Sequence, residues 1–238
     1  NKLESYLFYG DGNDEISNSI ITNNDAYFAI IHEVKNMYNT LVFNNTQHGS
    51  IGGWNDYDFE NIWNCNITHN QNLFVRIFNM WNCSFSHNLG VNHLVCWGSM
   101  RNCDVSYNSE VIAQFHIKIY GDVGGCNFTH NGGSLYSHGG NFINSIISYN
   151  DYGITIADRE TGGGVRQPNL ITTIHYCQIY NNASYNVCKI HGYPGNKYDV
   201  NATFNWWGTI NEDLIEEHIY DYYDDYNLGR VLYKPYLT

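Results

Sequence analysis

Basic, imidazole and aromatic side chains recur at one place in the chain's repeating pattern, six to ten residues after a regularly spaced asparagine. The residues at this place are His32, Arg76, Trp97, His116, Lys118, His138, Asp158, Lys189 and His191. Alternation along a strand sends His116 and Lys118 outward, because Ile117 between them faces inward. The same alternation turns Cys188 inward and Lys189 outward. This set predicts an outward groove of basic and aromatic side chains for an anionic or neutral glycan, the alternative being scattered residues on a solvated face.

An inserted segment lies next to the same strand. Residues 158–168 interrupt the repeat; they begin with Asp158 and contain Arg166 and three consecutive glycines. A segment without a place in a coil must bulge as a loop, and loops often carry binding residues. Arg166 therefore joins the candidate ligand-binding residues, while a tolerated surface insertion is the alternative.

The carboxylates do not occur in a catalytic arrangement. A glycosidase needs two acidic side chains across the scissile bond. The outward positions of the repeat strand hold one aspartate among six residues: Asn66, Ser84, Asp104, Asn127, Ile146 and Gln178. The acidic residues near the C-terminus lack the alternating spacing of a calcium loop, and no Cys/His spacing is typical of zinc. We therefore predict no catalytic residue, no metal and no cofactor.

Five of the seven cysteines share one position in the repeat: Cys65, Cys83, Cys103, Cys126 and Cys177. Stacked residues of a parallel ladder lie further apart than the roughly 3.8 Å that the Cβ atoms of a disulfide prefer. Buried thiols are therefore expected, with Cys96 and Cys188 outside the column and freer than the rest.

Six Asn-x-Ser/Thr sequons are candidate glycosylation sites: Asn44, Asn66, Asn82, Asn127, Asn182 and Asn201. Most of them arise because the repeat itself places an asparagine two residues before Ser or Thr. They are weak evidence for a glycoprotein.

These positions belong to an internal repeat that recurs about every 22 residues. Its core is a six-residue motif, for example CSFSHN at residues 83–88. Nine copies close on Asn24, Asn45, Asn70, Asn88, Asn108, Asn131, Asn150, Asn182 and Asn205. The spacings of 21, 25, 18, 20, 23, 19, 32 and 23 residues fit a solenoid, while helical repeats would need a 3.6-residue periodicity. The chain is predicted to be all-β, a single-stranded parallel β-helix (β-solenoid) of about nine coils of roughly 18–25 residues. Right-handedness follows from the usual hand of parallel crossovers.

Alternation assigns a role to each position of a coil. The Cys position and the apolar position two residues later face inward, so stacking forms a Cys column beside an apolar column. The closing asparagine is placed at a corner in the left-handed conformation, with its amide in an asparagine ladder. A second polar ladder is expected just before the Cys column: Asn18, Asn39, Asn64, Asn82, Asn102 and Asn144.

The last part of the chain departs from the repeat. Thr209 and Glu212 have the spacing of a capping box, which predicts a short helix from about Glu212 to Ile219 before a final strand and tail over residues 228–237. A solenoid end must be covered, because it otherwise exposes core and sheet edges. We divide the single domain into a β-helix over residues 1–204 and a C-terminal, helix-containing cap over residues 205–238.

Composition excludes two classes of partner. A formal charge of −12 argues against nucleic-acid binding, which needs clustered Lys and Arg. No apolar stretch reaches the about 18 residues of a membrane span. No signal peptide is visible, and the start at Asn1 indicates a processed or truncated chain.

Two motifs resemble known surface proteins. The FxxN segments at residues 85–88 and 128–131, with the GGSL segment at 132–135, resemble the repeats of polymorphic-membrane-protein adhesins. The NWWG segment at 205–208, with the VLYKP segment at 231–235, is similar to the end of adhesin-like β-helix proteins of microbial surfaces. The two resemblances cover residues 18–205 and 205–237. They imply a secreted or surface-exposed, adhesin-like protein.

The leading hypothesis is an extracellular or cell-surface β-helix that acts in adhesion, structure or recognition without catalysis. Its expected partners are glycans or proteins of a host or partner cell. The alternative is a carbohydrate-active β-helix, either a polysaccharide lyase or glycosidase or a glycan-binding tailspike-type module, because fold alone does not decide function. A third hypothesis is a piece of a longer repetitive surface protein or assembly.

Overall fold

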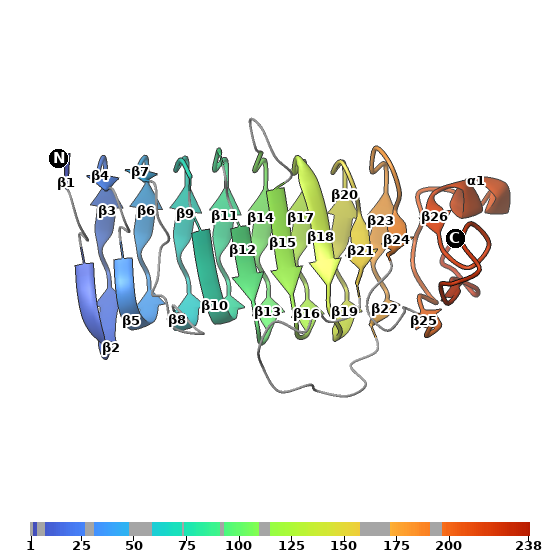
Figure 1. Cartoon of the computed structure of the whole chain (residues 1–238), viewed down its shortest axis with the longest axis horizontal. Helices are drawn as coiled ribbons and strands as arrows, with labels where there is room; N and C mark the ends of the chain where they lie inside the picture. The colour runs from blue at the N-terminus through green and yellow to red at the C-terminus, as the bar shows by residue number, and fades with distance from the viewer. Residues whose placement is uncertain are drawn as a thin grey trace.

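The computed structural model of the chain describes residues 2–3, 8–26, 31–47, 59–72, 74–90, 93–109, 115–157, 172–190 and 197–238. Its strands pair in parallel from coil to coil and form three sheets along the stack, with one short helix near the C-terminus (Figure 1). The predicted all-β parallel β-solenoid is confirmed.

One sheet consists of the three-residue strands of the repeat. Its strands are β3 (Ile20–Thr22), β6 (Leu41–Phe43), β9 (Asn66–Thr68), β11 (Ser84–Ser86), β14 (Asp104–Ser106), β17 (Asn127–Thr129), β20 (Ile146–Ser148) and β23 (Gln178–Tyr180). Corresponding repeat residues face each other in register, for example Phe85 opposite Val105 and Ile67. The repeat found in the sequence is therefore the structural repeat.

The large sheet contains sixteen strands. It begins with the long strands β2 (Phe8–Ser17), β5 (Ile31–Tyr38), β8 (Phe59–Trp63) and β10 (Phe74–Trp81). Beyond β10 it continues as two branches, since β10 pairs with both β12 and β13. One branch is β12 (His93–Cys96), β15 (Phe115–Ile119), β18 (Gly133–Ser137), β21 (Ile154–Ile156), β24 (Val187–Lys189) and β26 (Ile219–Tyr220). The other is β13 (Met100–Arg101), β16 (Val123–Gly124), β19 (Asn141–Ile143), β22 (Thr173–His175), β25 (Val200–Asn201) and β27 (Val231–Leu232).

Glycines mark the bend between the two branches. A Cβ atom on Gly121 would lie 2.0 Å from the carbonyl oxygen of Gly98, and one on Gly140 would lie 2.2 Å from that of Gly121. The backbones of successive coils therefore approach each other too closely for a side chain at this corner.

A third, smaller sheet follows the closing asparagines. It consists of β1 (Lys2–Leu3), β4 (Asp25–Ala26) and β7 (Thr46–Gln47). Single bridges continue it from Thr46 to Gln71, Leu89 and Ser109.

Two left-handed residues frame each strand of the eight-stranded sheet, with φ between 49° and 63°. The first group is Asn18, Asn39, Asn64, Asn82, Asn102, Gly125, Asn144 and Tyr176. The second group is Asn23, Asn44, His69, His87, Tyr107, His130, Tyr149 and Asn181. At the corner that follows each of these strands, the left-handed residue is thus the one before the closing asparagine. This corrects the prediction that placed the asparagine itself in the left-handed conformation.

The closing asparagines form the predicted ladder inside the stack. From Asn24 to Asn182, each side-chain amide lies 2.9–3.1 Å from the Oδ1 atom of the next closing asparagine. In Asn88 the amide also donates to the carbonyl oxygen of Ile67, at 3.0 Å. Both amide hydrogens are used, which permits these polar side chains to be buried.

Asn205 is an exception to this ladder. Its Oδ1 atom accepts the backbone N–H of Cys177 at 2.8 Å, so Asn205 continues the Cys column instead of following Asn182. The prediction that Asn205 closes the asparagine ladder is wrong. The six-residue pattern repeats there, but its strand β25 pairs with β22 of the large sheet, Asn201 opposite Thr173, and does not extend the eight-stranded sheet.

The core lies between the sheets. The inward apolar positions of the repeat are fully buried: Ile67, Phe85, Val105, Phe128, Ile147 and Ile179. The five column cysteines are 3% exposed or less. Burying each large apolar side chain contributes about 1.5–3 kcal/mol.

At the C-terminal end, α1 (Glu212–Glu217) lies beside β26 (Figure 1). Asn211, rather than Thr209, is its N-cap, because its side chain accepts the N–H of Asp213 at 3.1 Å. Trp207 and Ile215 are buried. In the described part of the chain, no helix has the length and apolar character needed to cross a membrane.

Candidate functional site

Two of the predicted basic residues lie on one outward column of the large sheet. Arg76 on β10 and Lys118 on β15 both pair with Val95 of β12, from opposite sides. Both basic side chains are half-buried. The structure therefore places these two candidates near each other, as the groove prediction requires.

Two aromatic candidates form a stack instead of a groove wall. Trp97 lies on Tyr120 with ring centroids 4.1 Å apart, and Tyr120 lies on His138 at 4.5 Å. His138 is only 7% exposed. These rings cover one another, so His138 does not line an open groove, which corrects that part of the prediction.

Lys189 faces the opposite way from its predicted direction. It is fully buried, and its Nζ atom donates a hydrogen bond to the carbonyl oxygen of Tyr198. Cys188, predicted to face inward, is half-buried on the outer face. Register with β21 causes the difference, since Cys188 pairs with Thr155 and Lys189 follows Ile156 in an inward column.

The side chains of five candidates cannot be placed. Asp158, Arg166 and His191 lie outside the described residues. The backbone of His32 lies in β5 and that of His116 in β15, between His93 and Ser134, but both side chains are outside the described part.

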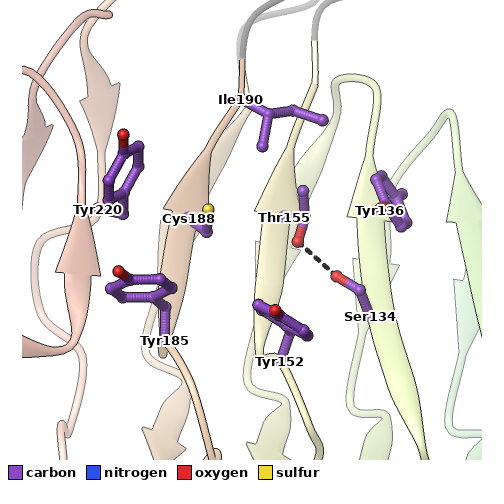
Figure 2. Close-up of a pocket in the computed structure, with 8 residues that line it drawn as sticks. All are labelled: Ser134, Tyr136, Tyr152, Thr155, Tyr185, Cys188, Ile190 and Tyr220. Atoms are coloured by element: carbon purple, nitrogen blue, oxygen red, sulfur yellow. Dashed lines mark hydrogen bonds between the residues drawn. The ribbon is translucent and has the colours of Figure 1, made fainter. Parts of the chain in front are cut away.

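The outward column that carries Arg76 and Lys118 leads into a pocket. From Lys118 it continues through Tyr136, Thr155, Cys188 and Tyr220, each on the next strand. The pocket has a volume of about 320 Å³. It is lined by Ser134, Tyr136, Tyr152, Thr155, Tyr185, Cys188, Ile190 and Tyr220 (Figure 2). We call this the tyrosine pocket.

The floor of the tyrosine pocket is a pair of hydroxyl groups. Ser134 and Thr155 are each 4% exposed, and their hydroxyls share a hydrogen bond (Figure 2). They lie on adjacent strands, β18 and β21, which fixes their separation. A hydroxyl both donates and accepts, so the floor offers neutral polar groups at the bottom of the pocket.

Tyrosine rings make most of the walls. Figure 2 shows Tyr185 and Tyr220 at one side of the pocket and Tyr136 at the other. The rings of Tyr185 and Tyr220 have centroids 5.4 Å apart and are tilted by 55°. All four tyrosines are half-buried, so part of each ring remains accessible.

The described lining of the tyrosine pocket carries no charged side chain, but acidic residues lie close by. Burial raises the pKa of the Cys188 thiol to about 11, and the negative charge of Asp224 adds to this effect. Burial, together with Asp225 and Asp224, also raises the pKa of Tyr220. The pocket is therefore neutral with a negative surrounding at its β26 side.

The thiols of the Cys column serve structure. Each Sγ atom lies 3.1–3.4 Å from the carbonyl oxygen two residues earlier. All seven cysteines are free. Cys96 is fully buried, so the prediction that it is freer than the column thiols is wrong, whereas Cys188 is partly accessible.

The sequons differ in exposure. Asn182 is 3% exposed and part of the asparagine ladder, which rules it out as a glycan acceptor in the folded chain. The other five side chains are exposed: Asn44, Asn66, Asn82, Asn127 and Asn201.

The acidic C-terminal residues have structural partners. Asp221 is buried, and its carboxylate accepts the N–H groups of Val231 and Tyr223 at 2.6 and 3.0 Å. Among the described residues, no three His, Cys, Asp or Glu side chains come together as a metal site.

Neither protein-family models, nor curated proteins, nor solved structures give a match to this chain.

Proposed function

We propose that this protein is a recognition β-helix of the cell surface or extracellular space that works without catalysis. Its partner binds in the tyrosine pocket on the outer face of the large sheet. The observation that carries the proposal is the concave site of four partly accessible tyrosines over a buried hydroxyl floor. Clefts lined by aromatic side chains with a few fixed polar groups are typical binding sites.

The chemistry of the lining supports binding rather than reaction. Acid–base catalysis needs a side chain that exchanges a proton near the working pH. The described lining contains tyrosines, two aliphatic hydroxyls, a thiol and an isoleucine. The thiol of Cys188 has a pKa of about 11, so it is a poor nucleophile at neutral pH.

Finer features of the fold belong to the same proposal. The nine copies of the repeat in the sequence are the basis for about nine right-handed coils, although the copy that ends at Asn205 does not join the asparagine ladder. Residues 205–238 then cover the C-terminal end. The burial of Trp207, and of Ile215 within α1, supports the covering role. The resemblance to adhesin-like surface proteins supports the location outside the cell, and the five exposed sequons are the candidate glycan acceptors there.

The test is a binding screen of the full chain on arrays of glycans and of cell-surface proteins. The pocket variant Tyr185→Ala/Tyr220→Ala is compared with Tyr222→Ala/Tyr223→Ala, which removes two exposed tyrosines outside the pocket. We expect the pocket variant to lose the specific signals and the control to keep them. Signals retained by the pocket variant, or release of reducing ends or unsaturated uronates from a polysaccharide panel, would overturn the proposal.

A further inference from the structure

The tyrosine pocket has the chemistry of a sugar site of one particular kind. We infer that its ligand is an uncharged saccharide, bound with the C–H face of a pyranose ring against tyrosine and its hydroxyls toward the floor. This inference rests on the proposed function, because it names the partner of the same pocket.

The walls match the apolar face of a sugar. A pyranose ring presents several C–H groups on one face and carries its hydroxyls around the edge. The negative face of an aromatic ring attracts such C–H groups and buries them from water. The ring planes of Tyr185 and Tyr220 are inclined at 55° to each other, with centroids 5.4 Å apart, so the two rings offer differently oriented faces to one ligand.

The floor matches sugar hydroxyls. The bond between Ser134 and Thr155 uses one of their two hydroxyl protons. A ligand hydroxyl that donates and accepts can join this pair without a fixed charge on either side. Because both residues are 4% exposed, a ligand group reaching them is taken out of water, and its hydrogen bonds decide which ligands fit.

Charge selects against acidic sugars. At the β26 side, the negative charge of Asp224 acts on Cys188, and those of Asp225 and Asp224 act on Tyr220. The whole chain carries a formal charge of −12. Among the described residues, neither lysine candidate lines the pocket: Lys118 lies one strand beyond Tyr136, and Lys189 is buried. A uronate, sialylated or sulfated glycan would meet repulsion without a described cation to compensate it.

Size limits the part of the ligand that is held. The volume of about 320 Å³ is near the lower end of the roughly 300–1,000 Å³ of small-molecule sites. A pocket of this volume suits one or two sugar units at the end or edge of a glycan.

The experiment measures the affinity of the full chain for neutral and acidic monosaccharides and disaccharides, by ligand-observed NMR and titration calorimetry. Glucose, galactose, mannose and N-acetylglucosamine are compared with glucuronate and N-acetylneuraminate. We expect at least one neutral sugar to bind, with affinity about tenfold lower in Tyr220→Leu, which keeps bulk but removes the ring. Tyr220→Phe, which keeps the ring, should remain close to the native affinity.

Two controls separate the explanations. Lys118→Ala should leave the affinity unchanged, and raising the salt concentration should change it little, because no ion pair is involved. Thermal unfolding checks that each variant is folded. Tighter binding of acidic sugars, a loss in Lys118→Ala, or no neutral sugar binding would overturn the inference. If no sugar binds but a protein partner still depends on Tyr185 and Tyr220, the inference fails while the proposed function stands.

Discussion

A serine, threonine or cysteine immediately precedes each strand of the eight-stranded sheet, and its side chain bonds back to the carbonyl two residues earlier. Ser19, Thr40 and Ser145 make this bond at 2.7–3.0 Å, as the cysteines do at slightly longer distances. In Cys83 the sulfur also accepts the backbone N–H of Cys65, at 3.3 Å. The column therefore needs a small donor and acceptor rather than sulfur chemistry, which explains why cysteines accumulate there without pairing.

An amino-acid substitution in the Cys column should be tolerated only when the new side chain keeps the hydrogen bonds to the neighbouring backbone. We expect Cys83→Ser to change the free energy of unfolding by less than about 1 kcal/mol. Cys83→Ala should cost about 1–2 kcal/mol more than Cys83→Ser, because the N–H of Cys65 and the carbonyl of Trp81 lose a side-chain partner. Urea unfolding measures both. Equal stability of the two variants would contradict the role assigned to the sulfur.

The buried asparagines should be much less replaceable than the exposed ones. Asn88 donates to Ile67 and Asn108 and accepts from Asn70. Asn88→Ala should therefore lower the free energy of unfolding by about 3–5 kcal/mol, since several buried polar groups lose their partners. Asn82→Ala, at an exposed left-handed corner, should cost only about 1–2 kcal/mol. A similar loss in both, measured by chemical unfolding, would contradict the distinction between the buried ladder asparagines and the exposed left-handed ones.

Cys188 provides a pH-dependent probe of the tyrosine pocket. Burial, aided by Asp224, disfavours its thiolate and raises its pKa to about 11, above the about 8.5 of a free cysteine. Its alkylation rate should therefore keep rising about tenfold per pH unit from about pH 7 to pH 10, where an ordinary thiol levels off near pH 9. Asp224→Asn should speed the reaction. A rate that levels off near pH 9 in the native chain, followed by mass spectrometry, would show an unperturbed thiol.

At the scale of elements, register decides which predictions succeed. The six-residue repeat correctly predicted which residues stack in β9, β11, β14, β17, β20 and β23. The Cys position and the apolar position two residues later both face inward, so they leave one possible assignment of the two sides of the strand. The large sheet has no such repeat. Cys188, Lys189 and Ile190 are compatible with either phase, and the aliphatic stem of Lys189 fills an inward position once its amine reaches the carbonyl of Tyr198. The different role of Asn205 could not be predicted either, because the six-residue motif recurs there while its strand pairs within the large sheet.

The bend of the large sheet should depend on its glycine corner. A Cβ atom on Gly121 would meet the carbonyl oxygen of Gly98 at 2.0 Å, whereas one on Gly124 would meet only the guanidinium of Arg101 at 3.4 Å. Gly121→Ala should lower the free energy of unfolding by more than about 2 kcal/mol, because backbone must move. Gly124→Ala should stay within about 1 kcal/mol of the native chain. If denaturant unfolding shows equal effects, the close approach of the coils is not what fixes this corner.

At the scale of the whole molecule, the stack brings together residues that no single coil contains. Ser134, Thr155, Cys188 and Tyr220 lie on four successive strands. Consecutive members of this set are 21 to 33 residues apart in the sequence. The sequence predicted that binding residues would lie on the strand that follows each closing asparagine. Lys118, one of those candidates, lies on the same outward column as the pocket. The sequence did not predict the tyrosine pocket, because tyrosine is frequent along the chain and only the register shows which rings converge.

The central claim is that recognition takes place in the tyrosine pocket and involves an uncharged sugar. Hydrogen–deuterium exchange of the full chain, with and without the tightest-binding neutral saccharide, tests it most directly. The account predicts added protection in residues 133–137, 152–156, 185–189 and 219–220, and no change in the eight-stranded sheet. Protection centred on β11, β14 and β17, or around Arg76 instead of the tyrosine pocket, would contradict it.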